Sequence, residues 1–231
     1  MKLIYLLVFL AVPNLQAATN ADLLLKKADD IRNPAQSYAM TVQVDDDGNQ
    51  TEFEVFIKDQ DKTIIVTKAP ARDRGRNMLM LDRDFQAFIP NLKRSMRLSL
   101  AQKLSGQVAN GDISRTRWHG DYSVTLEKET PQEAQLLLKA NKENLTYAWI
   151  RLWIDKKTNR PLRTEYLGLN GKTLLKKAYF ENYKEMAGDT RPSVIRIEDT
   201  NKKSSQVKII SMTPKKIEDS FFTVRNMESL K

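Results

Sequence analysis

The chain of 231 residues contains few side chains that could do covalent or metal chemistry. It has no cysteine, which excludes a disulfide, a thiol nucleophile and a thiolate metal site. It has one histidine, His119, so a metal centre built from several histidines is also excluded. A Ser-His-Asp hydrolase would need His119 as its base, and no G-x-S-x-G nucleophile motif accompanies it. A lipid hydrolase that pairs His119 with a nearby Ser or Asp therefore stays an alternative interpretation.

Two further motifs resemble binding sites but lack a required residue. A phosphate-binding loop ending at Gly171-Lys172-Thr173 would need a glycine at position 166, which is Tyr166. The aspartates Asp45–Asp47 are not followed by a glutamate at the spacing of an EF-hand calcium loop. Both segments are better explained as turns. The sequence predicts no catalytic residue, no metal site and no cofactor.

The charge of the chain is basic and unevenly distributed. The formal net charge is +9 at pH 7, and the sequence pI is about 9.6. Ten basic and four acidic residues lie between Arg72 and Arg117, so the excess is largely local and can focus an electric field. A solvated basic face is the alternative. From this segment we select six arginines as candidates for binding a partner protein or an anionic headgroup: Arg74, Arg76, Arg94, Arg97, Arg115 and Arg117.

The first segment is predicted to be a secretory signal peptide. The basic start Met1-Lys2 precedes the apolar run Leu3–Val12, and small residues follow near Ala17. The run is shorter than the ~20 residues that a membrane-spanning helix needs. We therefore expect a signal peptide at residues 1–17 and one exported domain at residues 18–231. An exported protein meets little nucleic acid, so we expect no nucleic-acid partner, and its basic charge favours transient contact with an anionic membrane surface or an acidic partner.

The elements that must position these residues are predicted to be short strands and two or three helical pieces. Thr19 or Asn20 can cap a first helix that ends before Pro34, and Ser99–Gly106 could form another. Turn residues separate about a dozen strand candidates, which is typical of an antiparallel meander in one domain. These candidates are Ser37–Val44, Thr51–Lys58, Lys62–Thr67, Met78–Leu81, Phe85–Ile89, Arg94–Ser99, Tyr122–Lys128, Ala134–Lys139, Tyr147–Asp155, Leu162–Leu167, Leu174–Tyr183, Ser193–Asp199 and Gln206–Met212.

Some of these strands are apolar on both faces. In Tyr147–Ile154 the odd positions include Trp149 and Trp153, and the even positions are all apolar. Met78–Leu81 is apolar at every position. An antiparallel sheet with one solvated face would carry polar residues on that face. The pattern therefore indicates either an ordinary core between two layers or a sheet wrapped around an apolar interior that could hold a ligand.

The middle of the chain carries the most specific pattern. Its segments are Lys68-Ala69-Pro70, Arg74-Gly75, Phe88-Ile89-Pro90, Lys93-Arg94, Leu104–Thr116 and Gly120-Asp121-Tyr122. With these segments the exported part of the chain resembles the LolA-like outer-membrane lipoprotein-sorting protein family, in the subgroup found beside exporters of the resistance-nodulation-division (RND) type.

The resemblance implies a mainly β fold, a single half-open antiparallel barrel of about eleven strands with a helical lid over an apolar cavity. It implies a monomeric periplasmic carrier that binds the acyl chains of a lipid or lipoprotein and shuttles them between an inner-membrane RND-type exporter and the outer membrane. A cargo-free accessory subunit of such an exporter is another alternative. The founding carrier holds its lid closed with an arginine that has no counterpart in Gln43–Val55, so the sequence leaves lipoprotein and free lipid open as cargo.

On this interpretation the cavity wall consists of apolar strand residues. Ten are expected to contribute: Phe53, Val55, Ile57, Ile64, Val66, Met78, Met80, Phe88, Trp149 and Trp153.

Overall fold

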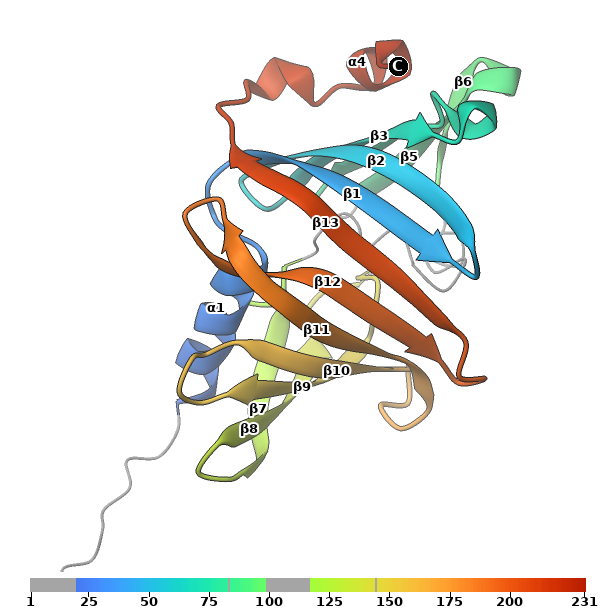
Figure 1. The fold of residues 1–231 in the computed structure, drawn as a ribbon. Helices are drawn as coiled ribbons and strands as arrows, with labels where there is room; N and C mark the ends of the chain where they lie inside the picture. The colour runs from blue at the N-terminus through green and yellow to red at the C-terminus, as the bar shows by residue number, and fades with distance from the viewer. Residues whose placement is uncertain (1–19, 83, 99–116, 144) are drawn as a thin grey trace, which may run out of the picture.

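The computed structural model describes residues 20–82, 84–98, 117–143 and 145–231. The predicted signal peptide, the predicted helix Ser99–Gly106 and Arg115 lie outside these residues. The described chain forms one antiparallel sheet of 13 strands that does not close (Figure 1). The strands are β1 (Tyr38–Asp46), β2 (Asn49–Lys58), β3 (Lys62–Ala69), β4 (Met78–Leu81), β5 (Asp84–Ile89), β6 (Arg94–Arg97), β7 (Tyr122–Glu129), β8 (Glu133–Ala140), β9 (Trp149–Asp155), β10 (Pro161–Leu167), β11 (Leu174–Met186), β12 (Asp189–Asp199) and β13 (Ser204–Pro214).

Each segment that the sequence predicts as a strand forms one, and the mainly β, half-open architecture is confirmed. The sheet has thirteen strands, whereas the resemblance implied about eleven. Two of the thirteen, β4 and β6, are only four residues long and lie near one edge of the sheet.

The strand order makes two meanders that meet in the middle of the sheet. The order is β6-β5-β4-β3-β2-β1-β13-β12-β11-β10-β9-β8-β7, so the first strand of the described chain pairs with the last. The edges are β6 and β7, which follow one another among the described strands and lie at opposite ends of the sheet. Strong twist bends the sheet so that β1–β5 lie above β8–β12 in Figure 1.

Helix α1 (Ala21–Arg32) packs on one face of this sheet, against β7, β10 and β12. We call the face of the sheet that α1 contacts the inner face. The Asn20 side chain accepts a hydrogen bond from the backbone N–H of Leu23, which confirms Asn20 as the N-cap. Leu25 and Ala28 are fully buried, and the helix stops one residue before Asn33 and Pro34, as the sequence predicts.

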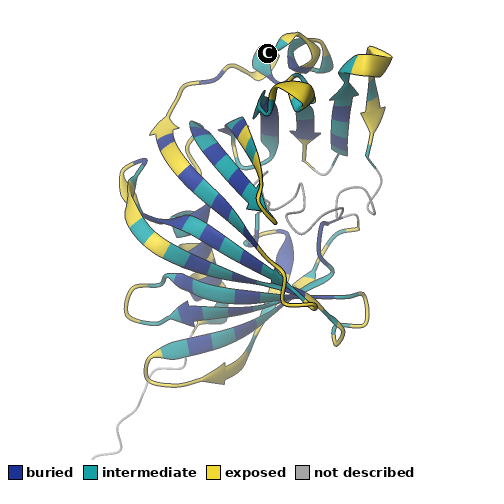
Figure 2. Cartoon of the chain, turned by 45° about the vertical axis from the view of Figure 1, so that its right-hand side comes forward, coloured by how far each residue is buried: buried dark blue, intermediate teal, exposed yellow. Residues whose placement is uncertain are grey.

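The inner face carries the main hydrophobic cluster. Every second residue of most strands is buried, which appears as alternating dark and light bands along the ribbons of Figure 2. In β9, for example, Ile150, Leu152 and Ile154 are at most 1% exposed. Together with α1 these residues fill the inner face along β7–β12.

A second hydrophobic cluster lies on the opposite, outer face of β2–β5. After β13 the chain continues through a 3-10 helix, η3 (Asp219–Phe221), to the last helix, α4 (Val224–Ser229). The buried residues of this segment, Ile217, Phe222 and Met227, pack on Phe56 and its outer-face neighbours. Two further 3-10 turns, η1 (Ala71–Asp73) and η2 (Pro90–Leu92), follow β3 and β5.

Candidate functional site: an apolar pocket with an arginine at its rim

A pocket of about 500 Å³ opens on the part of the sheet that α1 does not cover. Volumes of this size are typical of small-molecule sites. Its lining combines apolar strand residues with one acid and one base: Thr51, Phe53, Thr67, Asp73, Arg76, Met78, Ala87, Phe88, Ile89 and Leu98.

The strand register explains why these residues meet. Phe53 of β2 pairs with Thr67 of β3, and Met78 of β4 pairs with Ala87 of β5. Residues directly opposite in an antiparallel ladder share a face, and alternation adds Ile89 to the set. Phe53 belongs to the inner cluster, so the pocket continues the inner face over β2–β5, away from the strands against which α1 mainly packs. The wall is therefore largely apolar, and most of it comes from strand residues.

The rim of the pocket is charged. Arg76 lies with its Nη1 3.3 Å from Asp73 Oδ1, and its side chain is 54% exposed. The hydroxyl of Thr67 donates to the carbonyl of Arg76 at 2.7 Å, which fixes the loop that carries the guanidinium. Arg94 pairs in register with Ile89, so it points to the same face as the pocket. A ligand held against the apolar wall would therefore meet arginines where it leaves the pocket.

A glycine brings the two arginine-bearing loops together. Gly75 has a φ of +84°, and a Cβ at this position would lie 3.5 Å from Pro90 Cγ. Only glycine adopts such a backbone conformation without strain. The loop of Arg74 and Arg76 thus lies beside the turn that leads to Arg94. The remaining arginine of this loop, Arg74, donates from Nε to the carbonyl of Lys68.

The predicted wall residues divide between the two faces of the sheet. Phe53 and Met78 line the pocket, Val55 and Ile57 belong to the inner cluster beside it, and Met80 alternates with Met78 on the same face. Of the other five, Phe88 also lines the pocket, and the remaining four do not and require a correction of face. Ile64, Val66 and Phe88 pack in the outer cluster. Trp149 and Trp153 lie on the outer face, opposite Ile150, Leu152 and Ile154.

The two tryptophans have basic partners on that outer face. Lys139 Nζ lies 5.3 Å from the ring centre of Trp149, and the Arg163 guanidinium lies 4.5 Å from that of Trp153. Cation–π contacts of this kind cover an aromatic ring without burying it in a core. The apolar character of both β9 faces therefore does not require a hollow on each side.

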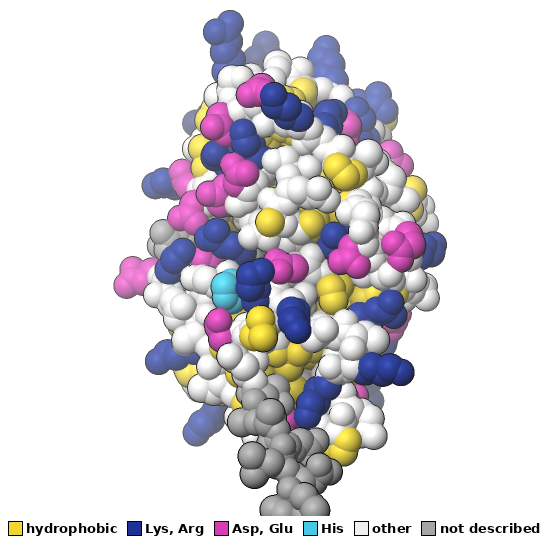
Figure 3. Space-filling model, turned by 90° about the vertical axis from the view of Figure 1, so that its left-hand side faces the viewer, with side chains coloured by type: hydrophobic (Ala, Val, Ile, Leu, Met, Phe, Trp, Pro, Cys, Tyr) yellow, Lys and Arg dark blue, Asp and Glu magenta, His cyan; other side chains and the backbone are white. Residues whose placement is uncertain are grey.

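The other selected arginines lie away from the pocket mouth or bind acids. Arg97 Nε donates to Asp84 Oδ1 at 2.5 Å, and Arg117 Nη2 lies 3.2 Å from Asp121 Oδ1. Basic and acidic side chains are also interspersed over the face shown in Figure 3. Of the described candidate arginines, Arg76 lines the pocket, Arg94 points to the same face, and Arg74 lies in the loop that carries Arg76.

His119 contacts two aspartates of helix α1. Its Nε2 is 3.5 Å from Asp22 Oδ2 at the exposed start of α1, and its backbone N–H donates to Asp29. Among the described residues no group of three or more His, Asp and Glu side chains is arranged to hold a metal ion. No helix in the described part of the chain is long and apolar enough to cross a membrane.

Sequence reasoning missed the buried polar group that fastens α1. Asp29 is 2% exposed, and its Oδ2 accepts from the backbone N–H groups of Trp118 and His119 at 2.7 and 2.9 Å. Its Oδ1 accepts from Arg32 at 2.8 Å, and the Arg32 guanidinium lies 4.1 Å from the Trp118 ring centre. The i,i+3 spacing of Asp29 and Arg32 on the predicted helix was the sequence pattern that could have indicated this ion pair.

The pocket also contains strand residues that the sequence analysis did not select. These are Thr51, Thr67, Ala87 and Ile89, and Leu98 follows β6. Phe85, Ala87 and Ile89 alternate with Phe88 along β5, so choosing Phe88 selected the other face.

A half-open antiparallel barrel with a helix against its inner face and an apolar pocket beyond that helix defines the structural class. A solved LolA superfamily protein from Nitrosomonas europaea is 32% identical to this chain, with a TM-score of 0.80, and the match covers 90% of this chain and 99% of that one. The chain therefore belongs to the LolA superfamily, and the resemblance seen in the sequence is confirmed.

Three other comparisons give a family model, a shared fold and no match. A family model described as "Uncharacterized protein" matches residues 59–229. The outer membrane lipoprotein-sorting protein domain from Vibrio parahaemolyticus, given as putative in its description, has the same fold at 18% identity. Its TM-score is 0.71, over 90% of this chain and 98% of that one. No match was found among curated proteins.

Proposed function

We propose that this protein is a monomeric periplasmic carrier that holds the acyl chains of a lipid or lipoprotein in the inner-face pocket. It takes them from an inner-membrane exporter of RND type and delivers them toward the outer membrane. The observation that carries this proposal is the apolar pocket of about 500 Å³ beside Arg76 and Arg94. Membership of the LolA superfamily supports the same kind of cargo.

The physical need for such a pocket follows from acyl hydration. Burial of one methylene group is favourable by about 0.8 kcal/mol, so exposing a long acyl chain to water costs roughly 10 kcal/mol of free energy. A pocket walled by Phe53, Met78 and Ile89 offsets this penalty during transfer. The guanidinium of Arg76 is exposed at the rim, where a phosphate or carboxylate headgroup accepts its hydrogen bonds. The ligand class is therefore an anionic amphiphile.

Loading can be tested with the protein purified from a bacterial periplasm. Native mass spectrometry should find bound lipid, and a fluorescent fatty acid should compete for the same site. Ala87→Trp would place an indole in the pocket, and if it displaces about three methylenes the affinity falls about fiftyfold. Ser123→Trp, on the exposed edge strand β7, is the matched control and should bind normally. Protein that is purified without bound lipid and also fails to bind the fatty acid would contradict the proposal.

The headgroup preference has its own test. Replacing Arg76 and Arg94 by serine should weaken binding of phosphatidylglycerol more than binding of phosphatidylcholine, because only the former has a net negative charge. Equal loss for both lipids would remove the headgroup role but leave the acyl pocket intact.

A further inference from the structure

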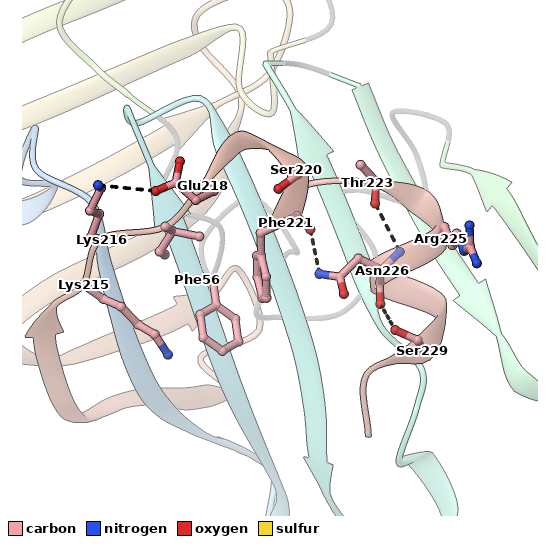
Figure 4. A pocket seen from close by; sticks show the side chains of 11 residues that line it. Phe56, Lys215, Lys216, Glu218, Ser220, Phe221, Thr223, Arg225, Asn226 and Ser229 are labelled. Atoms are coloured by element: carbon pink, nitrogen blue, oxygen red, sulfur yellow. Dashed lines mark hydrogen bonds and ion pairs between the residues drawn. The ribbon is translucent and has the colours of Figure 1, made fainter.

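A second hollow, of about 610 Å³, lies on the outer face of the sheet, where the C-terminal segment crosses β2 (Figure 4). We call it the C-terminal groove. Its lining comes from one strand residue and the segment after β13: Phe56, Lys215, Lys216, Ile217, Glu218, Ser220, Phe221, Thr223, Arg225, Asn226 and Ser229. The inner-face pocket has none of these residues in its lining. The proposed carrier function does not use this groove.

The frame of the groove is fixed at both ends. At one end Asp219 lies 3.0 Å from Lys58 and 2.9 Å from Lys62. At the other end the buried side chain of Asn77 donates to the carbonyls of Met227 and Leu230, each at 2.8 Å. A hollow held in this way exists before a partner arrives, so binding does not have to order it.

The groove combines an aromatic floor with basic walls. The Phe56 and Phe221 rings make an edge-to-face contact at 4.9 Å and lie between Lys215 on one side and Arg225 on the other (Figure 4). Lys215 Nζ lies 4.9 Å from the Phe56 ring centre. Among the described residues no carboxylate forms an ion pair with Lys215 or Arg225, whereas Lys216 lies 3.5 Å from Glu218. The groove therefore presents to a ligand two cations, one on each side of an aromatic patch.

We propose that the C-terminal groove binds an acidic peptide segment of a partner protein, with one apolar side chain between its carboxylates. The apolar side chain packs on Phe56 and Phe221, and the carboxylates pair with Lys215 and Arg225. Thr223, Asn226 and Ser229 already hydrogen-bond to the backbone of their own segment, so these polar groups do not decide between ligands. The two cations on either side of the aromatic rings are what favour an acidic peptide over an uncharged acyl chain.

The position of the groove lets a partner and the cargo be bound at the same time. Phe53 lines the inner-face pocket and Phe56 lines the groove, and the two residues point to opposite faces of the same strand, β2. A partner can therefore hold the protein by its outer face while the pocket stays open for loading. If no peptide binds, the carrier proposal still stands. If the purified protein carries no lipid, the peptide-binding proposal still stands.

The test uses a pool of fluorescein-labelled hexapeptides with Glu or Asp at positions one, two, five and six and Phe, Leu, Ile or Trp between them. Fluorescence anisotropy against the purified mature protein should show saturable binding. The double variant K215E/R225E should weaken it at least tenfold, because both cations are replaced by acids. Lys172→Glu, at the exposed tip between β10 and β11, is the matched charge control and should bind like the unmodified protein.

Three results would overturn the proposal. One is the absence of binding by the acidic pool at millimolar concentration. Another is equal binding by a pool with Lys in place of Glu and Asp. The third is binding of vesicles containing phosphatidylglycerol that K215E/R225E abolishes while peptide binding is unchanged, since the groove would then be a membrane surface. Amide NMR shifts that map to Phe56 and Phe221 on addition of the acidic pool would place the peptide in the groove and support the proposal.

Discussion

Replacing Asp29 by alanine is expected to loosen α1 from the inner face more than any change of an exposed helix residue. The substitution removes the acceptor for two buried N–H groups, on Trp118 and His119, and leaves the 6%-exposed Arg32 without its carboxylate. Breaking a buried ion pair from one side costs about 3–5 kcal/mol. Because domains of this size are stable by about 5–15 kcal/mol in total, the loss is a large fraction.

Urea unfolding followed by tryptophan fluorescence measures this loss, and thermal melting should show a midpoint lower by about 10 °C. Asp30→Ala is the matched control, since Asp30 is the next residue of the same helix and makes only an exposed ion pair with Lys26. It should unfold like the parent protein. Hydrogen exchange should speed up at the amides of Trp118 and His119 only in the Asp29 variant. An Asp29→Ala protein destabilised by less than about 1 kcal/mol would refute the reasoning.

Three further outcomes follow from buried groups and one turn. Burial raises the pKa of Tyr122 above its usual value, so near pH 10 only the unfolded chain ionises there. Its contribution to stability is complete below that pH and falls by about 1.4 kcal/mol per pH unit above it. Alkaline urea titrations should show this slope together with that of Tyr183, whose pKa burial also raises, and Tyr122→Phe should remove only the Tyr122 share. Asn77→Leu should release the C-terminal segment and raise hydrogen exchange across α4, while the far edge strand β7 keeps its protection. Gly171→Ala should lower stability by about 1–3 kcal/mol in urea unfolding, since φ is +66° and the new Cβ would lie 3.1 Å from Trp149.

The strands were predictable because their signals are local. Alternating side chains and turn residues such as Asp45–Asp47 act over a few positions, and both survive in the folded protein. The turn between β1 and β2 forms around Asp47 and Gly48, both with positive φ. The single helix before Pro34 was predictable for the same reason, since its cap and its stop lie next to it in the sequence.

The faces were not predictable, because they depend on contacts far away in the sequence. Ile64 and Val66 were assigned to a cavity wall, yet they pack beneath residues near the end of the chain, among them Phe222 and Met227. Nothing within a strand tells which of its two apolar faces will meet α1. The Asp29 carboxylate likewise finds its backbone partners 89 and 90 residues away, on a segment with no sequence pattern of its own.

The doubly apolar strands can now be understood as evidence for two layers of covering rather than for one large hollow. On β2, Val55 is buried against the inner cluster and Phe56 against the C-terminal segment, so both faces are apolar because each has its own cover. The cover of the inner face is incomplete over β2–β5, away from the strands against which α1 mainly packs, and the cover of the outer face is incomplete where η3 leads into α4. Each incomplete cover leaves a hollow, lined by Phe53 in one case and Phe56 in the other. Because Phe53 and Phe56 lie three residues apart on β2, a shift of β2 at one hollow is expected to move the wall of the other. Binding at the C-terminal groove and loading of the inner-face pocket are therefore expected to be energetically linked, which a comparison of peptide affinity with and without bound lipid would measure.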